Sequence, residues 1–134
     1  MTKLLLTKDI ALQRAEYSKE IDEIAEQFRL LFLTEGTAQA FVYAEKLAEA
    51  RTYLGSNMNP DPVGYFFLPK EAERLNISIE EAARMIIAKA SDQNAKLAEI
   101  ELFRLSAKAN IRASISNLEI LSVFTDFVGK VRAL

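Results

Sequence analysis

The 134-residue sequence contains no cysteine and no histidine, and it has only 4 glycines and 3 prolines. Without cysteine there are no disulfides, thiolate metal sites or cysteine nucleophiles. Without histidine the commonest general base and transition-metal ligand is missing. Most of the glycines and prolines lie between Gly36 and Pro69. Residues 1–35 and 70–128 contain neither glycine nor proline, which favours long helices.

A strong charge of one sign and long hydrophobic runs are also missing. The net charge is -2, so no overall positive field attracts nucleic acid. No stretch approaches the length of uncharged apolar residues that spans a membrane. The leucine run near the start is too short for a signal-peptide core. We therefore expect no membrane partner, and the cytoplasm, or a particle assembled there, as the location.

What the sequence does contain fits a globular domain, with 50% apolar and 27% charged residues. By length it predicts a single domain over residues 1–134. Its most instructive stretch is Tyr65–Ile87, where Pro69 suits the first turn of a short helix ending at Leu75. Asn76 can take the left-handed conformation that ends a helix. Ser78 and Glu81 form a capping box, which predicts that a long helix begins at Ile79.

The other elements follow from hydrophobic periodicity and from breaker residues. Apolar residues recur every three or four positions in the first third of the chain, which is typical of a helix. A second capping box, Ser116 to Glu119, predicts a final helix. The expected order is a loose lead-in at 1–7, a helix up to Gly36, a helix at Thr37–Leu54, a loop at 55–64, the short helix, a long helix to about Ser114, and a helix at Asn117–Val131. This order predicts an all-α bundle of about four to five helices, with two long helices and a short one started by proline.

The acidic residues of the first helix have a spacing that also occurs in metal sites. Glu20, Glu23 and Glu26 share one helical face, but di-metal bundles pair such glutamates with a histidine three residues on. A solvated acidic face is the simpler interpretation. Glu45 and Glu49, near Lys46 and Arg51, also suit a solvated side of their helix. We expect no catalytic residue, metal or cofactor, and no enzymatic activity.

The segment Ala72–Ser78, followed by a helix, has the length of a helix-turn-helix. A DNA-reading helix begins with basic or amide side chains that meet phosphates and bases. This one begins with Glu80 and Glu81, which would repel phosphate. Nucleic-acid binding is therefore disfavoured.

Several large apolar residues exceed what one helix face can bury, and these are the candidate protein interface. Phe66 and Phe67 either form a core plug, the favoured interpretation, or a partner-binding tip. Of the three aromatics, Tyr65 is the one expected to be partly exposed, because its hydroxyl group needs water or a partner. Self-association is the commonest way to cover such a surface, so we expect a homo-oligomer that forms through the first helix, the last helix or both. The candidate interface residues are Tyr65, Phe66, Leu30, Phe32, Leu33, Phe124 and Phe127.

Residues 44–122 contain, in order, AEKLAEARTYL, a loop with two prolines, FLPKEAERLNISIEEAARMIIAKA and LAEIELFRLSAKANIRASISNLEI. This arrangement resembles that of small helical bacteriophage proteins encoded among tail and other virion genes. The chain departs from that pattern at Asn76, where those proteins usually have glycine.

The resemblance implies a non-enzymatic protein that binds other proteins in virion or tail assembly, as a structural component or an assembly chaperone. Its expected location is then the virion or the host cytoplasm. One alternative is a small phage inhibitor of a host enzyme or defence complex. A DNA-binding regulator is a less favoured third.

Overall fold

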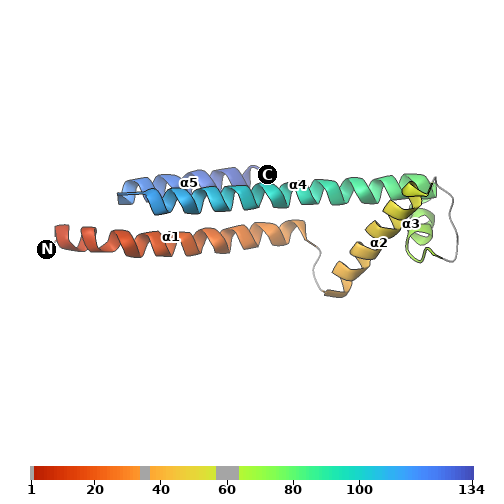
Figure 1. Cartoon of the computed structure of the whole chain (residues 1–134), viewed down its shortest axis with the longest axis horizontal. Coiled ribbons are helices and arrows are strands. Elements are labelled where there is room, and N and C mark those ends of the chain that lie inside the picture. The colour runs from red at the N-terminus through yellow and green to blue at the C-terminus, as the bar shows by residue number, and fades with distance from the viewer. Residues whose placement is uncertain (1, 34–36, 57–63) are drawn as a thin grey trace. The chain divides into compact units, whose positions relative to one another are not determined.

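Helices account for all the regular structure of residues 2–33, 37–56 and 64–134, which are the residues that the computed structural model describes. Figure 1 shows their arrangement. The chain is all-α as predicted, with two long helices and a short one that has Pro69 in its first turn. The five helices are α1 (Thr2–Phe32), α2 (Thr37–Gly55), α3 (Leu68–Leu75), α4 (Ile79–Ala113) and α5 (Asn117–Arg132).

The boundaries agree with the sequence to within about a residue, except at the two ends of the first helix. This helix was expected to reach Gly36, but α1 ends at Phe32 and Leu33 lies outside it. Helix α1 begins at Thr2, so the expectation of a loose lead-in over residues 1–7 was wrong for residues 2–7. Gly36 and residues 57–63 of the expected loop lie outside the described residues. The polar run at residues 91–94 does not interrupt α4, because its side chains can face water while the backbone stays helical.

The predicted helix ends have the expected geometry. Asn76 has φ 55° and ψ 47°, which is the left-handed conformation. The Ser78 hydroxyl accepts the backbone N–H of Glu81 at 3.1 Å and begins α4. The Ser116 hydroxyl accepts the backbone N–H of Glu119 at 3.2 Å and begins α5. The Glu119 carboxylate in turn accepts the N–H of Ile115 at 2.8 Å, so it closes the cap from one residue further out.

The contacts divide the chain into two compact units, where the sequence predicted one domain. Unit 1 comprises residues 1–32 and 96–134, and unit 2 comprises residues 33–95. Unit 1 therefore contains α1, the second half of α4 and α5. Unit 2 contains α2, α3 and the first half of α4.

Unit 1 is a three-helix arrangement in which α1 and α5 run parallel and the second half of α4 runs opposite to both (Figure 1). One apolar stripe from each helix meets in a common core, as ridges of helical side chains do in bundles. Beside the core, the ring of Tyr17 meets that of Phe124 edge to face, with centroids 5.0 Å apart. The buried residues are Ile21, Ala25, Ile100, Ala107, Ile111, Phe127 and Val131.

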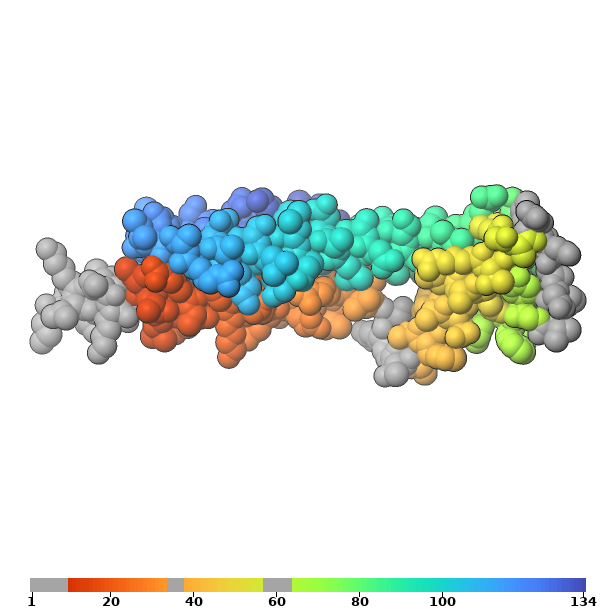
Figure 2. Space-filling model, in the orientation of Figure 1, coloured from red at the N-terminus to blue at the C-terminus, as the bar shows by residue number. Residues whose placement is uncertain are grey.

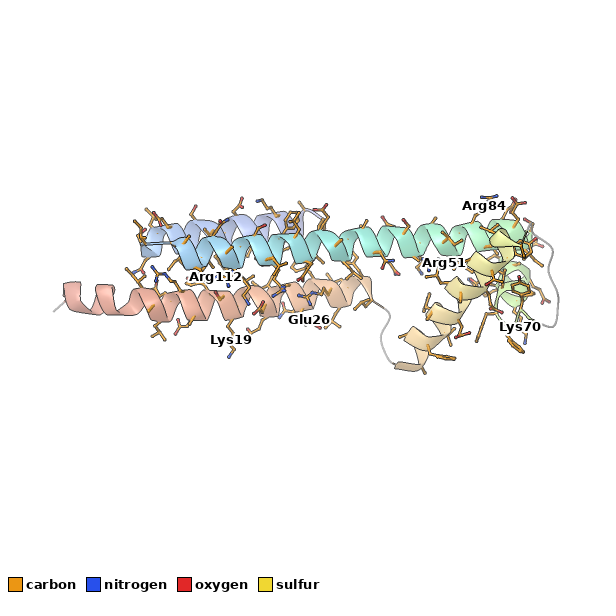
Figure 3. The ribbon with its side chains drawn as sticks, in the orientation of Figure 1. Lys19, Glu26, Arg51, Lys70, Arg84 and Arg112 are labelled. Atoms are coloured by element: carbon orange, nitrogen blue, oxygen red, sulfur yellow. The ribbon has the colours of Figure 1, made fainter. Side chains whose placement is uncertain are left out.

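Charged contacts join α1 to α4 at the edge of this core. The Asp22 carboxylate lies 2.7 Å from the Lys108 ammonium and 2.9 Å from the Arg104 guanidinium. Burial raises the pKa of Asp22, but the hydrogen bonds from Lys108 and Arg104 outweigh it and hold the pKa below its ordinary value. On the other side of α1, Lys19 points away from the neighbouring helices (Figure 3).

Two phenylalanines test this account of the core. Phe127 is 1% exposed and Phe66 is 73% exposed. We expect Phe127→Ala to lower the free energy of unfolding by about 3–5 kcal/mol, because it empties a packed site. Phe66→Ala should change it by less than about 0.5 kcal/mol. Urea unfolding followed by circular dichroism measures both, and similar losses in the two variants would contradict the assigned core.

Candidate protein-binding groove

Unit 2 is organised around the side chain of Leu68, which is 0% exposed. It packs with small residues of all three helices, and Tyr65 closes the cluster with its ring edge to face on Tyr53 at 6.1 Å between centroids. Four of the buried residues are alanines, so the helix backbones approach closely here. The buried cluster is Ala50, Tyr53, Leu68, Ala72, Ala82 and Ala83.

The Glu49 side chain is the one polar group that orders this cluster. It is 8% exposed, and its carboxylate accepts the backbone N–H groups of Phe66, Phe67 and Leu68. The distances are 2.9 Å to Phe67 N and 3.2 Å to Leu68 N. Leu68 is the first residue of α3 and Phe67 is its N-cap, which supplies no side-chain acceptor of its own, so Glu49 replaces the missing cap. A carboxylate at a helix N-terminus also interacts favourably with the helix dipole.

The role of Glu49 corrects the sequence analysis, which placed it on a solvated face of α2. It also decides between the two interpretations of the aromatic run. The plug is Leu68, whereas Phe67 is only partly buried and Phe66 points into solvent. Tyr65 is partly exposed, as expected, with its ring packed against Tyr53, but Phe66 and not Tyr65 is the most exposed of the three.

An apolar groove of about 880 Å³ lies between α2, α3 and α4 within unit 2. Figure 2 shows α2 and α3 lying against the first part of α4 in this unit. Met85 contributes a half-exposed thioether side chain (55%) to the groove. The apolar lining residues are Leu33, Ala40, Ala44, Leu47, Leu75, Ala82, Met85, Ile86 and Ala90.

The rim of the groove is positively charged. Among the described lining residues, Lys46, Arg74 and Lys89 are basic, whereas Glu71 alone is acidic. The Lys46 and Lys89 ammonium groups lie 5.4 Å and 5.2 Å from the centroid of the Tyr43 ring, within the range of cation–π contacts.

Glu71 anchors two of these cations. Its carboxylate lies 2.6 Å from Arg74 and 3.2 Å from Lys46. The hydrogen bond from Arg74 lowers the pKa of Glu71, burial opposes this, and the hydrogen bond from Lys46 lowers it further. The pKa therefore stays below its ordinary value, and Glu71 remains ionised and holds both cations at the rim.

The seven candidate interface residues divide between the two units and differ in exposure. Leu30 and Leu33 are half or more exposed, and Leu33 lines the groove. Phe66 is exposed at the start of α3. Phe127 belongs to the core of unit 1, so its assignment to an interface was wrong.

The remaining three candidates are partly buried. Tyr65 packs on the cluster of unit 2, and Phe124 and Phe32 pack on the core of unit 1. The Lys96 ammonium also lies 5.1 Å from the centroid of the Phe32 ring. Phe32 and Phe124 are partly buried because the turn of their helices points them at a neighbouring helix, and Tyr65 because its ring packs on Tyr53. An excess of apolar residues in the sequence does not reveal these directions.

Sequence reasoning missed the groove residues Tyr43, Met85 and Lys89. Tyr43 and Lys89 lie on different helices, so no spacing along the chain connects them. A weak signal for Glu49 did exist, because a helix begun by proline without a capping side chain needs an outside acceptor. Nothing in the sequence identifies which carboxylate supplies it.

Two searches across the described residues complete the survey. No group of three or more acidic, histidine or cysteine side chains in residues 2–33, 37–56 and 64–134 is placed to hold a metal ion. In the same part of the chain, no helix combines the length and apolar character needed to cross a membrane.

The capping role of Glu49 can be measured directly. We expect Glu49→Ala to lower the free energy of unfolding of unit 2 by about 2–4 kcal/mol, since the buried N–H group of Leu68 and the partly buried ones of Phe66 and Phe67 lose their acceptor. The matched control is Glu45→Ala, an exposed glutamate one turn earlier on the same helix, with a change below about 0.5 kcal/mol. Hydrogen exchange read by mass spectrometry should accelerate at residues 65–75 in Glu49→Ala alone. Equal exchange in both variants would refute the cap.

Comparison with known proteins adds no relative: no family model matches the chain, and no significant match is found to a curated protein or to a solved structure.

Proposed function

We propose that this protein acts without catalysis, by binding other proteins in bacteriophage virion or tail assembly, as a structural component or an assembly chaperone. The observation that carries the binding role is the groove of unit 2. It joins an apolar floor to a charged rim, which is the composition of surfaces that take a protein segment. The phage setting rests on the sequence resemblance over residues 44–122. The virion or the host cytoplasm is the corresponding location.

The proposal includes self-association through the outer surface of α5. Leu118 is 77% exposed there, and Leu121 is half exposed. Gly129 lies in mid-helix, where a Cβ would meet nothing within 4 Å. Glycine costs a helix about 1 kcal/mol relative to alanine, and this chain's own packing does not require it. Close approach of a second helix gives a reason for it.

The assembly role predicts that the protein co-purifies with particles through its groove. Met85→Glu places a charge on the apolar floor without touching the buried cluster, because Met85 is 55% exposed. We expect this variant to be lost from purified particles or from assembly intermediates. The control Leu12→Glu, at a residue 56% exposed on α1, should be retained. Quantitative mass spectrometry of particles from infected cells measures both.

Different outcomes separate the candidate functions. Absence of the unmodified protein from particles and from assembly intermediates would contradict the assembly role and favour the inhibitor of a host enzyme or defence complex. Retention of Met85→Glu at the level of the unmodified protein would show that the groove is not the binding surface.

Self-association is tested by sedimentation equilibrium at micromolar concentration. We expect a mass above that of one chain, and a shift to one chain in Gly129→Leu, whose side chain would hold a second helix away. Ala109→Leu is the control, an exposed position on α4. A single-chain mass for the unmodified protein would contradict the oligomer, and a retained oligomer in Gly129→Leu would exclude the α5 surface.

A further inference from the structure

We infer that the groove of unit 2 binds a foreign amphipathic helix whose apolar face is flanked by acidic residues. The inference rests on the proposed function, because it specifies the chemistry of the partner that the groove takes. Three features of the groove lead to it: the spacing of its lining residues, the sign of its rim and the polar groups at the last turn of its α4 wall.

The lining residues follow helix faces. On α4 they recur at Ala82, Met85 and Ile86, Lys89 and Ala90, and Gln93 and Asn94. That spacing covers about three turns, or roughly 17 Å along the axis. On α2 they recur at Ala40, Tyr43 and Ala44, and Leu47. Two walls of this kind fit a third helix, whose anchors at positions i, i+3 or i+4, and i+7 point at the floor.

The rim selects the charge of the occupant. Glu71 neutralises part of the charge of Lys46 and Arg74, whereas Lys89 contacts the Tyr43 ring and meets no carboxylate within ion-pair distance among the described residues. A carboxylate of the partner could therefore form ion pairs with these cations. A basic partner would face Lys89 and Arg74 with repulsion.

Gln93 and Asn94 line the last turn of the α4 wall. Their amide groups both donate and accept hydrogen bonds. A helix that ends in the groove leaves backbone groups without intrahelical partners, and these amides can satisfy them. A flexible aliphatic chain would have no such need.

A second copy of this chain does not supply the occupant from its acidic helix. Helix α1 exposes Glu16, Glu20, Glu23 and Glu26, which have the required charge. Its exposed leucines lie outside this acidic stretch, at Leu12 and from Leu30 onward. The large apolar residues between them, such as Ile21, pack on the core of unit 1, so the acidic stretch has no free apolar face to supply anchors. The occupant is therefore a different protein, which carries both the acidic flank and a free apolar face.

The experiment is a selection of helical 16-residue peptides from a randomised display library on the full-length protein. We expect enriched sequences with apolar residues at helical spacing and with aspartate or glutamate beside them. A synthetic peptide of the consensus sequence is then titrated by fluorescence anisotropy. Its Kd should rise with NaCl concentration, because the rim contacts are partly exposed.

Matched variants locate the binding and identify its chemistry. Ala44→Arg fills the floor from an exposed position and should weaken binding at least about 100-fold. Lys89→Glu should weaken it at least about 5-fold. Lys70→Glu has the same change in net charge at an exposed residue of α3 outside the groove, and it should leave the Kd unchanged (Figure 3). Circular dichroism melting confirms that each variant folds, and Met85→Glu replaces Ala44→Arg if the latter does not.

Three outcomes would overturn the inference. Enrichment of neutral or basic helices that Ala44→Arg still blocks would refute the acidic partner but leave the groove as a protein-binding site. Peptide binding that survives both Ala44→Arg and Met85→Glu would place the site elsewhere. A groove-dependent oligomer, converted to single chains by Ala44→Arg, would make a second copy the occupant. Failure of the proposed function itself is measured separately, by the loss or retention of Met85→Glu in particles.

Discussion

The carboxylate of Glu49 at the start of α3 is the interaction on which unit 2 depends. It collects the N–H groups of three consecutive residues and carries a charge of the sign that a helix N-terminus favours. Helix α3 has eight residues, and a helix so short is not stable by itself in water. The Glu49 contact and the burial of Leu68 together hold it against α2 and α4. Without them the groove would lose its α3 wall, and with it the Glu71 carboxylate that positions Lys46 and Arg74.

The two units reach stability by different means. Unit 1 relies on large apolar side chains such as Ile100, Ile111 and Phe127, which meet from three helices, and on charged contacts at the edge of the core. Unit 2 buries mostly alanine around one leucine and one tyrosine, and the buried Glu49 carboxylate accepts hydrogen bonds from backbone N–H groups. The small core of unit 2 leaves apolar positions of α2 and α4 uncovered, and these positions form the groove. The unit therefore has an apolar surface available for a partner because its own small core covers few of its apolar side chains.

Particular elements show how far sequence reasoning reached. The all-α class, the short proline-started helix, the left-handed Asn76 and both capping boxes depend on residues within four positions of each other, so the local sequence predicts them. The exposure of the candidate interface residues could not be predicted in this way. Of the seven residues, Phe127 is core, while Leu30 and Leu33 are exposed around the end of α1 and Phe66 is exposed just before α3. Counting surplus apolar residues detects that some are exposed, but it does not say which ones, because exposure depends on which helix packs against each face.

The sequence by itself determined the helices, their caps and their approximate ends, since these follow from backbone propensities and from hydrogen bonds between near neighbours. The absence of cysteine and histidine likewise excluded whole classes of chemistry. Only the tertiary structure decided that Glu49 is buried, that Leu68 rather than Phe67 is the plug, and that Tyr43 and Lys89 meet at the rim of a groove. Each of these joins residues 17 or more positions apart on different elements. Contacts of that kind are set by how the helices pack against each other. The local sequence around a glutamate does not say whether it lies on the surface or caps a neighbouring helix.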